Sequence, residues 1–511
     1  MEDNNKFKAF MSKLKIDTSN KKVNLIVSAV CLVIAIVITI ISGIQFSSFR
    51  NYEAEFVLRD GVVDEVIKFH EYSKHLEGTI ADSDIYVING TENTVALVKA
   101  DKASGYSSTI PATATICAVK GNDTQISAAQ DTLGRKDFVM VDSVKAAKEG
   151  VLNGTYDVAI LRHADAKVAA EGLAIAKAKV EKLPSILVLG GTHPNEPAGQ
   201  LAATLYLENA KVERGILYVV TELNRSGYSH SLPQEATPWY YSFKVGDTTR
   251  TFKYGARTSN TVDQWPTPDV YRHSSGQKLS GSEVRNINRA YPGSETGTFT
   301  ERIGWAMTNF VLQNEVTMVI DLHEASPEYA VINAMVYHQD SKEIASTAFN
   351  NYFENIYDNI DLQLSALDLH GLTHRELGDY TGAYVFLFET SNASQGKLHG
   401  KVNTSLIMYD NYVDKFYEYA TSKTTIDDKI IYGAPVAMRE RVGRHVESVD
   451  SIVRAFNQKG GYSRSLFEYT KMKNPPKGGE HLGDLLISSV PTYSEIMNNG
   501  VAYYLLPSER K

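Results

Sequence analysis

The stretch SILVLGGTHPNEPAG, residues 185–199, opens the part of the chain whose pattern decides the fold. Its apolar run ends at two glycines, Gly190 and Gly191, as in a buried strand that turns sharply at its end. His193 and Glu196 follow at once, three positions apart. A short turn there can direct an imidazole and a carboxylate to one point, and zinc binds such donors. The spacing is common by chance, but its place after a strand favours a metal site.

Short apolar runs alternate with longer amphipathic segments from residue 185 onward. The apolar runs are SILVL (185–189), GILYVV (215–220), VTMVI (316–320) and YVFLF (384–388). The amphipathic segments are AGQLAATLYLENA (198–210), TERIGWAMTNFVLQN (300–314) and the stretch 397–415. This alternation predicts an α/β fold with a largely parallel, buried sheet. Ligand sites in such sheets gather at the carboxyl ends of the strands.

A further candidate ligand follows the run that ends at Ile320, where VTMVIDLHEAS places His323. A catalytic zinc site needs three protein ligands and one position left for water. A histidine after a strand is otherwise often a hydrogen-bonded core residue, and the motif at residues 193–196 favours the ligand role. The only cysteines are Cys31 and Cys117, which excludes a disulfide framework and a thiolate-rich metal site.

The candidate general base is Glu389, which directly follows the apolar run 384–388 in YVFLFETS. A carboxylate there is costly to bury unless it is paired, hydrogen-bonded or functional. Near a metal-bound water it can accept a proton and pass it to the leaving amine. The alternative is a structural partner for a nearby arginine.

Residues 284–293, VRNINRAYPG, carry the candidate substrate-binding groups. The amide of Asn288 and the guanidinium of Arg289 suit a substrate carboxylate, which they can bind through paired hydrogen bonds. Arg272 lies earlier, in VYRHSSG, and is a candidate for stabilising the oxyanion that forms on an attacked carbonyl. Isolated arginines of this kind are more often surface charges.

The motifs GGTHPNE, NRAYPG followed by GTFTERI, DLHE and FLFET, in this order, resemble the zinc carboxypeptidase superfamily. These motifs are most similar to those of its succinylglutamate desuccinylase and aspartoacylase branch, and the resemblance covers roughly residues 185–415. The resemblance implies a mixed, mostly parallel sheet flanked by helices, with one zinc ion per chain at the strand ends. His193, Glu196 and His323 match the zinc ligands of the family, and Glu389 matches its catalytic glutamate.

The resemblance also assigns the substrate groups. Asn288 and Arg289 match the carboxylate-binding pair, and Arg272 matches the oxyanion arginine, with Arg285 as the rival. Arg375, in THRELGDYTG, is a candidate for a second carboxylate contact, which acidic substrates of this branch require, or else a surface charge. A tyrosine that some members place near the substrate has two candidates here, Tyr380 and Tyr384.

One position departs from the family. Members usually carry aspartate two positions before the Asn-Arg pair, where it orients a zinc-binding histidine, and this chain has Asn286. An amide oxygen still accepts an imidazole N–H, but it carries no charge. Changes of this kind typically alter metal affinity or activity 10–100-fold.

The N-terminal part predicts a membrane anchor. Residues 23–44, VNLIVSAVCLVIAIVITIISGI, carry no charge, and about 20 apolar residues suffice to cross a bilayer. Lysines precede this segment, so we expect residues 1–22 in the cytoplasm, a helix over 23–45 and the remainder outside the cell membrane as a single-pass protein. A cleaved signal peptide is the alternative reading.

The remaining organisation follows from these segments. Residues 46–183 are expected to form an extracytoplasmic region of unknown role, with strands at IYVIN, TVALV and DFVMV and a helix over 164–183. Residues 184–424 form the expected hydrolase domain, and 425–511 a C-terminal extension with a helix over 436–457. The domain boundaries rest on the changes in pattern alone.

The formal net charge is −8, which excludes the basic surface typical of nucleic-acid-binding proteins. The motifs together predict a zinc-dependent hydrolase that cleaves an amide bond next to a free carboxylate, of the N-acyl amino acid deacylase type. One alternative is an extracytoplasmic metallocarboxypeptidase for peptides or cell-wall fragments. Another is a membrane-anchored binding or scaffold protein with a decayed site, for which Asn286 is the best support.

Overall fold

The computed structural model describes residues 65–68, 84–167, 170–230, 238–245, 248–350, 360–409, 436–460 and 466–470. The predicted cytoplasmic segment 1–22 and transmembrane helix 23–45 lie outside these ranges. Within them, none of the helices is both long and apolar enough to span a bilayer.

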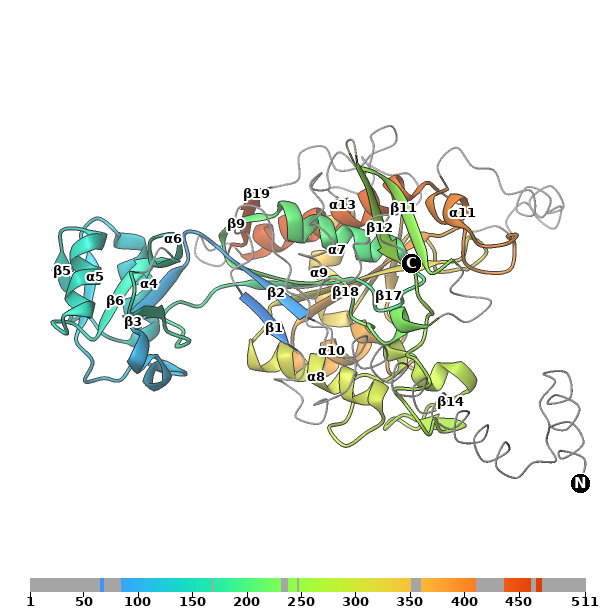
Figure 1. Cartoon of the computed structure of the whole chain (residues 1–511), viewed down its shortest axis with the longest axis horizontal. Helices are drawn as coiled ribbons and strands as arrows, with labels where there is room; N and C mark the ends of the chain where they lie inside the picture. Colours follow the sequence, from blue (N-terminus) through green and yellow to red (C-terminus); the bar gives the residue numbers. More distant parts are fainter. Residues whose placement is uncertain are drawn as a thin grey trace, which may run out of the picture. The chain divides into compact units, whose positions relative to one another are not determined.

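A central sheet of eight strands organises the larger part of the described chain (Figure 1). Its strands, in spatial order, are β1 (Glu65–Lys68), β2 (Asp84–Asn89), β10 (Ile216–Val220), β8 (Ser185–Leu189), β15 (Met318–Ala325), β18 (Tyr384–Ser391), β16 (Ala334–Tyr337) and β17 (Asp361–Leu364). The four strands β10, β8, β15 and β18 are parallel, whereas β2 and β16 run antiparallel to their neighbours in this group. The predicted α/β architecture with a mixed, largely parallel sheet is confirmed.

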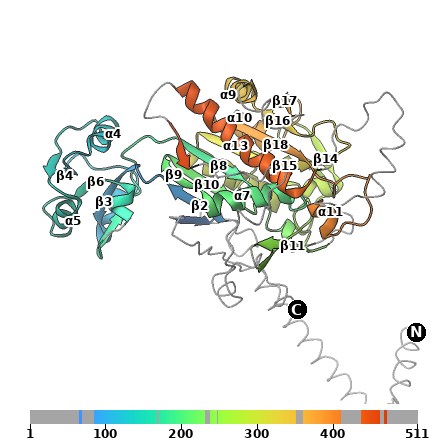
Figure 2. The same cartoon turned by 90° about the horizontal axis from the view of Figure 1, so that it is seen from above.

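Helices cover both faces of this sheet (Figures 1 and 2). On one face, α7 (Pro197–Asn209), α9 (Lys342–Ala348) and α13 (Met438–Gly460) share an apolar core with Ile186 and Val188 of β8. On the other face, α8 (Phe299–Gln313) and α10 (Thr373–Thr381) share a second apolar core with Leu187 and Leu189. Because successive strand residues face opposite sides, a strand buried on both faces needs the unbroken apolar run that the sequence shows.

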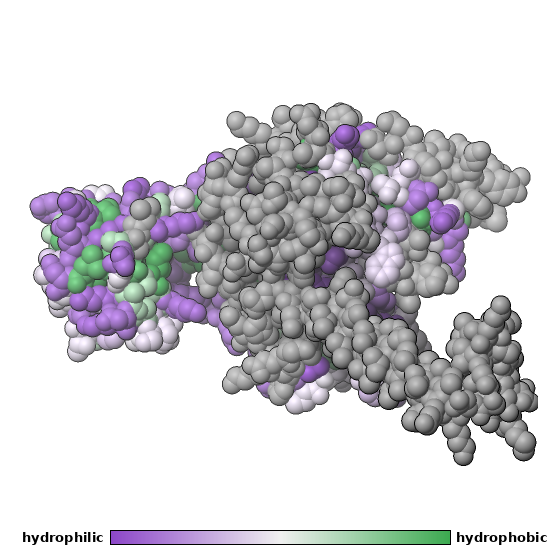
Figure 3. All heavy atoms as spheres, in the orientation of Figure 1, coloured by the Kyte–Doolittle hydropathy of each residue, from purple (hydrophilic) through white to green (hydrophobic). Residues whose placement is uncertain are grey.

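A second sheet lies within residues 94–175, with the order β5 (Val139–Val141), β4 (Ile116–Val119), β6 (Val158–Arg162), β3 (Thr94–Lys99) and β7 (Leu173–Ile175). The helices α4 (Asp123–Leu133) and α5 (Val144–Leu152) contribute to the two apolar cores on its faces. Hydrophilic side chains cover much of the coloured surface of this part, with apolar patches between them (Figure 3).

Smaller elements complete the described chain. They are the ladders β11 (Tyr240–Val245) with β12 (Thr248–Lys253), β13 (Val270–Arg272) with β14 (Lys278–Ser280) and β9 (Lys211–Arg214) with β19 (Glu468–Thr470), and the short helices η3 (Ala100–Tyr106), η4 (Gly227–Ser229), η5 (Gly281–Arg285), η6 (Ile287–Arg289) and η7 (Gln339–Ser341).

The helix predicted over residues 164–183 is wrong. Among the described residues of this stretch, the chain forms α6 (His163–Lys167) and β7 and no helix longer than α6. Gly172 has a φ of 87°, outside the helical region, and residues 176–180 alternate between buried and exposed positions. Alanines and lysines in strict alternation suit an extended segment with one buried side as well as they suit a helix.

Two expectations for the C-terminal half have different outcomes. The helix predicted over 436–457 is confirmed as α13, which packs on the central sheet. The long amphipathic stretch predicted over 397–415 contains only the five-residue α11 (Thr404–Met408) up to residue 409, and the rest lies outside the described residues. The domain boundaries stay predictions, although β2 and α13, from either side of the predicted hydrolase domain, belong to the central sheet and its cover.

Candidate active site

The three predicted metal ligands come from the ends of two neighbouring parallel strands, β8 and β15. After β8 the chain turns at Gly191, whose φ of 70° and close approach to Thr221 leave no room for a side chain. His193 follows in this turn, and Glu196 stands at the N-terminus of α7. His323 lies inside β15, which extends further than its apolar run.

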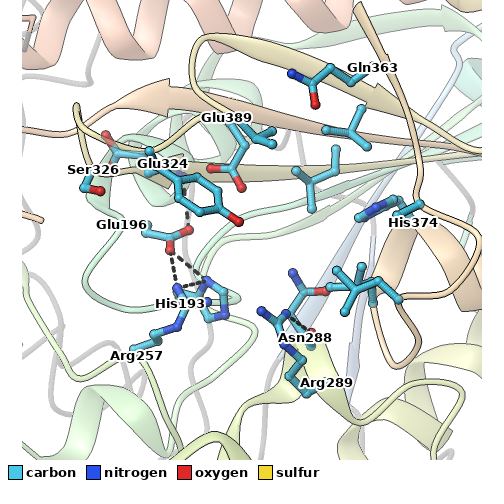
Figure 4. A pocket seen from close by; sticks show the side chains of 18 of the residues that line it. His193, Glu196, Arg257, Asn288, Arg289, Glu324, Ser326, Gln363, His374 and Glu389 are labelled. Atoms are coloured by element: carbon cyan, nitrogen blue, oxygen red, sulfur yellow. Dashed lines mark hydrogen bonds and ion pairs between the residues drawn. The ribbon is translucent and has the colours of Figure 1, made fainter. Parts of the chain in front are cut away.

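The structure brings these three residues together, and Figure 4 shows two of them, His193 and Glu196. His193 Nδ1 lies 2.7 Å from Glu196 Oε1, and His323 Nδ1 lies 2.9 Å from Glu196 Oε2. The two Nδ1 atoms are 3.2 Å apart. All three side chains are at most 2% exposed. Two imidazoles and one carboxylate therefore converge at a single buried point.

The other ring nitrogens explain why this point suits a cation. His193 Nε2 lies 2.9 Å from Asn286 Oδ1, and His323 Nε2 lies 2.9 Å from Asp321 Oδ2. Because both partner oxygens accept hydrogen bonds, each Nε2 carries the proton and each Nδ1 presents a lone pair. Lone pairs and the Glu196 carboxylate then face one another within hydrogen-bond distance. The arrangement fits a divalent metal ion and matches the way proteins orient metal-binding histidines.

The shifted pKa values of Glu196 and His323 also indicate that the site favours a positive charge. Burial opposes charge on Glu196, but His193 and His323 outweigh it and lower the Glu196 pKa well below its ordinary value. Burial also opposes charge on His323, yet Asp321 and Glu196 raise its pKa well above the ordinary range. The negative charge at the point of convergence is thus balanced either by a proton on His323 or by a metal ion.

Asn286, the departure from the family pattern, does accept the imidazole N–H of His193. Its own amide Nδ2 donates to Glu283 Oε2 at 2.9 Å. The Glu283 carboxylate therefore accepts a hydrogen bond from the Asn286 amide. This makes the Asn286 oxygen a better acceptor for the N–H of His193. Glu283 was not predicted, since its position before Asn286 has no counterpart in the motif.

Arg257 is the arginine that lies at the candidate metal site. Its Nη1 donates to Glu196 Oε1 at 3.0 Å and to His193 Nδ1 at 3.2 Å. Arg272, predicted for the oxyanion role, lies exposed on β13, outside the described residues that line the cavity. The rival Arg285 is buried and donates to the carbonyl oxygen of Ser259. The loop that carries Arg257 has no pattern that would have singled it out.

Glu389 lies on β18, paired in register with His323 of β15, one of the candidate metal ligands. The side chain lines the cavity, and its Oε2 has no hydrogen-bond partner among the described residues (Figure 4). Burial, and secondarily the charge of Glu196, raises the pKa of Glu389 to about 8. A half-buried carboxyl group with a free oxygen beside a candidate metal site suits a general base.

Asn288 and Arg289 also line the cavity. Asn288 Oδ1 accepts hydrogen bonds from Thr373 N at 2.8 Å and from Thr373 Oγ1 at 3.1 Å. Arg289 donates from Nη1 to the Asn288 carbonyl oxygen at 2.6 Å, and its Nε lies 3.5 Å from Glu283 Oε2. The guanidinium thus stands on the cavity wall with its orientation set by neighbours.

The structure does not bring Arg375 into the cavity. Its Nε lies 3.1 Å from Asp379 Oδ2 within α10, and the side chain is 2% exposed. Tyr380 is exposed, and Tyr384 makes a T-shaped ring contact with Phe456. The tyrosine that lines the cavity is Tyr329, which the sequence did not single out.

The cavity has a volume of about 460 Å³. Charged groups gather at the end formed by the candidate metal ligands, Glu389 and Arg289. The lining also includes the apolar side chains of Val336, Leu364, Leu369, Leu372 and Leu387. Figure 4 shows the polar lining residues Gln363 and His374 on the side away from His193 and Glu196.

A second histidine and carboxylate group lies elsewhere, formed by His273, His370 and Glu376. His273 Nε2 contacts the carbonyl oxygen of Tyr291 at 2.7 Å, and its Nδ1 contacts Ser275 Oγ at 2.8 Å. Protein groups already satisfy both nitrogens, so this group does not require an ion.

No protein-family model matches the chain, and no curated protein matches it. Among solved structures, it is similar to the cell shape determinant Csd4 from Helicobacter pylori, with 12% identity over 57% of this chain and 54% of that chain and a TM-score of 0.34. Another Csd4 structure is described as a D,L-carboxypeptidase bound to mDAP. A succinylglutamate desuccinylase from Silicibacter sp. TM1040 matches with 19% identity over 42% of this chain and 52% of that chain, with a TM-score of 0.27.

The matched structures include one described as a D,L-carboxypeptidase and one described as a succinylglutamate desuccinylase, which are the two kinds of enzyme that the motifs resemble. The chain spans about half the length of these structures.

Proposed function

We propose that this protein is a zinc-dependent hydrolase that cleaves an amide bond next to a free carboxylate, of the N-acyl amino acid deacylase type. The observation that carries the proposal is the convergence of His193, Glu196 and His323 on one point beside Glu389, whose Oε2 has no hydrogen-bond partner among the described residues. Arg289 and Asn288 on the same cavity wall supply the group that recognises a carboxylate. A binding or scaffold protein has no use for a general base at a metal site.

The substrate is held at two points. Arg289 binds its carboxylate through paired hydrogen bonds, and Asn288 adds an amide contact. Arg257, beside Glu196, is positioned to stabilise the oxyanion that forms on the attacked carbonyl. This assigns to Arg257 the role that the sequence had suggested for Arg272.

Glu389 moves the protons of the reaction. It accepts one from the attacking water and delivers it to the nitrogen of the leaving amine, so that the carboxyl group ends as it began. Its pKa of about 8 in the metal-free site lies close to neutral pH, where transfer in both directions is efficient. A zinc ion held by His193, Glu196 and His323 would supply Lewis-acid polarisation of the carbonyl and of the water.

The test is hydrolysis by the zinc-loaded full chain in detergent, with N-acetyl and N-succinyl amino acids and short peptides as substrates and the released amine as the readout. We expect turnover of N-acyl amino acids and a loss of about 10²–10⁴-fold in kcat for Glu389→Gln, with zinc still bound. Cleavage of peptides alone would contradict the deacylase assignment. A zinc-loaded protein that turns over neither class would overturn the hydrolase proposal.

The membrane anchor and the outward orientation of the hydrolase domain remain part of the proposal on sequence grounds. They rest on the uncharged segment 23–44 and the lysines before it. A peptide or cell-wall fragment would then also be within reach of the site, which is why peptides belong in the test.

A further inference from the structure

The apolar end of the cavity has a floor built by three neighbouring strands. Val336 of β16 pairs with Leu387 of β18 on one side and with Gln363 of β17 on the other. Residues that pair directly across strands present their side chains on the same face of a sheet. These three side chains therefore form one row, and all three line the cavity.

Strand β18 connects this row of side chains to the catalytic end of the cavity. Leu387 precedes Glu389 by two residues on β18, so the two side chains share a face about 7 Å apart. Ala334 pairs with Glu389 in the next row. A substrate whose scissile bond lies at Glu389 thus extends naturally onto Leu387 and Val336.

The opposite wall comes from the segment that begins α10, with Leu372 and His374 lining the cavity. Thr373, between them, makes two hydrogen bonds to Asn288 Oδ1. These hydrogen bonds hold the wall in place beside Asn288 and Arg289, the proposed carboxylate-binding pair. His374 is 5% exposed, and its Nδ1 has no partner among the described residues.

The charges of the cavity are confined to the other end. Among the described lining residues, the arginines are Arg257 and Arg289, and both lie near Glu283 at the carboxylate-binding end. Burial, together with the charge of His323, lowers the pKa of His374 to about 3, which leaves it neutral. Arg375, the candidate partner for a second substrate carboxylate, pairs with Asp379 instead.

We propose that this end of the cavity, here called the side-chain pocket (Val336, Gln363, Leu372, His374 and Leu387), selects substrates in which the residue bearing the free carboxylate has an uncharged, apolar side chain. The inference rests on the proposed function and narrows its substrate class. A second carboxylate would lose its water in this pocket without gaining a cation, whereas each apolar methylene buried there favours binding.

The pocket is tested by kcat/KM of the zinc-loaded full chain on N-acetyl glycine, alanine, leucine, methionine, aspartate and glutamate, with the N-succinyl series alongside. We expect kcat/KM to rise at least about fourfold per buried methylene and to favour leucine over aspartate by about 100-fold or more. Equal or faster turnover of aspartate or glutamate would overturn the pocket assignment and leave the hydrolase proposal intact. Absence of turnover in both series would instead count against the proposed function.

A variant in the side-chain pocket tests whether the pocket determines the substrate selectivity. Gln363 is partly exposed on the edge strand β17, so Gln363→Arg is expected to be tolerated and to add the missing cation. We expect it to shift the leucine-to-aspartate ratio at least about tenfold toward aspartate. The matched control is Leu312→Arg on α8, where the wild-type side chain is 45% exposed, and it should leave the ratio unchanged. A folded Gln363→Arg variant with the wild-type ratio would contradict the proposal.

Thermal stability gives a readout that does not depend on turnover. Free leucine should raise the Tm of the zinc-loaded protein more than free aspartate at equal concentration, because a ligand stabilises the state that binds it. In Gln363→Arg the order of the two amino acids should move toward aspartate. The reverse order in the wild type would overturn the assignment of the pocket.

Discussion

His323 and Glu389 occupy paired positions on the neighbouring parallel strands β15 and β18. A candidate metal ligand and the candidate base therefore face the same side of the sheet, at a separation set by the strand spacing. A slip of one residue would turn either side chain to the opposite face of the sheet, into the apolar core that covers it. The register of β15 and β18 thus sets the geometry of the site.

A buried ion pair joins the central sheet to α13. Arg441 Nη1 lies 2.6 Å from Glu324 Oε1, and both side chains are fully buried. Arg441→Leu leaves the Glu324 charge without its partner, so we expect a loss of about 3–5 kcal/mol in the free energy of unfolding. Urea unfolding of the metal-free protein measures it. The double variant Glu324→Gln with Arg441→Leu should recover part of this loss, and a single variant within about 1 kcal/mol of wild type would contradict the prediction.

The two hydrogen bonds that join His193 to Asn286 and Asn286 to Glu283, here called the relay, lead to a prediction about zinc affinity. An aspartate at position 286 would restore a charged acceptor for His193, but beside Glu283 it would face a like charge 2.9 Å from the present amide nitrogen. We expect Asn286→Asp combined with Glu283→Gln to bind zinc about tenfold more tightly than wild type. Asn286→Asp alone should gain less. Competition with a chelator measures the affinities, and equal affinities in all three proteins would refute the relay.

Variants of Arg257 and Arg272 test which of the two arginines stabilises the oxyanion, the one placed by the structure or the one suggested by the sequence. Arg257→Ala should lower kcat/KM by about 10²–10³-fold, because it removes the group placed to stabilise the oxyanion. It should not weaken zinc binding, since a positive charge beside His193 and Glu196 is removed. Arg272→Ala, on the exposed β13, should stay within about twofold of wild type. The opposite ranking of the two variants would restore the assignment made from the sequence.

The raised pKa of Glu389 predicts a pH-dependent stability of the metal-free protein. Folding raises this pKa from its ordinary value of 4.5 to about 8, because burial and the charge of Glu196 disfavour the ionised form. The neutral group is therefore tolerated at low pH, and stability is lost as the pH rises toward and through 8. Metal-free Glu389→Gln keeps a neutral side chain, so its Tm should exceed that of wild type increasingly between pH 5 and 9. A difference that does not change with pH would contradict the raised pKa.

The sequence was most informative where a functional residue follows an apolar strand. His193, Glu196, His323 and Glu389 could be predicted because strand ends in a parallel sheet meet at one edge, and the structure brings the four together. The strands themselves could be predicted for the same reason, since a strand buried on both faces leaves an unbroken apolar run.

The residues that the sequence did not reveal lie on loops and helix ends. Arg257, Glu283, Tyr329 and His374 reach the cavity through the path of the chain between elements, which no local pattern encodes. Arg375 does not line the cavity and pairs with Asp379, because an arginine in a helix lies next to an aspartate four residues later.

Metal content tests the central claim most directly. The full chain is purified in detergent, loaded with zinc and washed, and bound metal is measured in wild type, in Glu196→Ala and in Glu149→Ala, whose wild-type side chain is 62% exposed. We predict about one zinc per chain in wild type and Glu149→Ala, and its loss in Glu196→Ala, because a site with three protein ligands does not retain the ion with two. No bound zinc in wild type, or equal zinc in wild type and Glu196→Ala, would contradict the account.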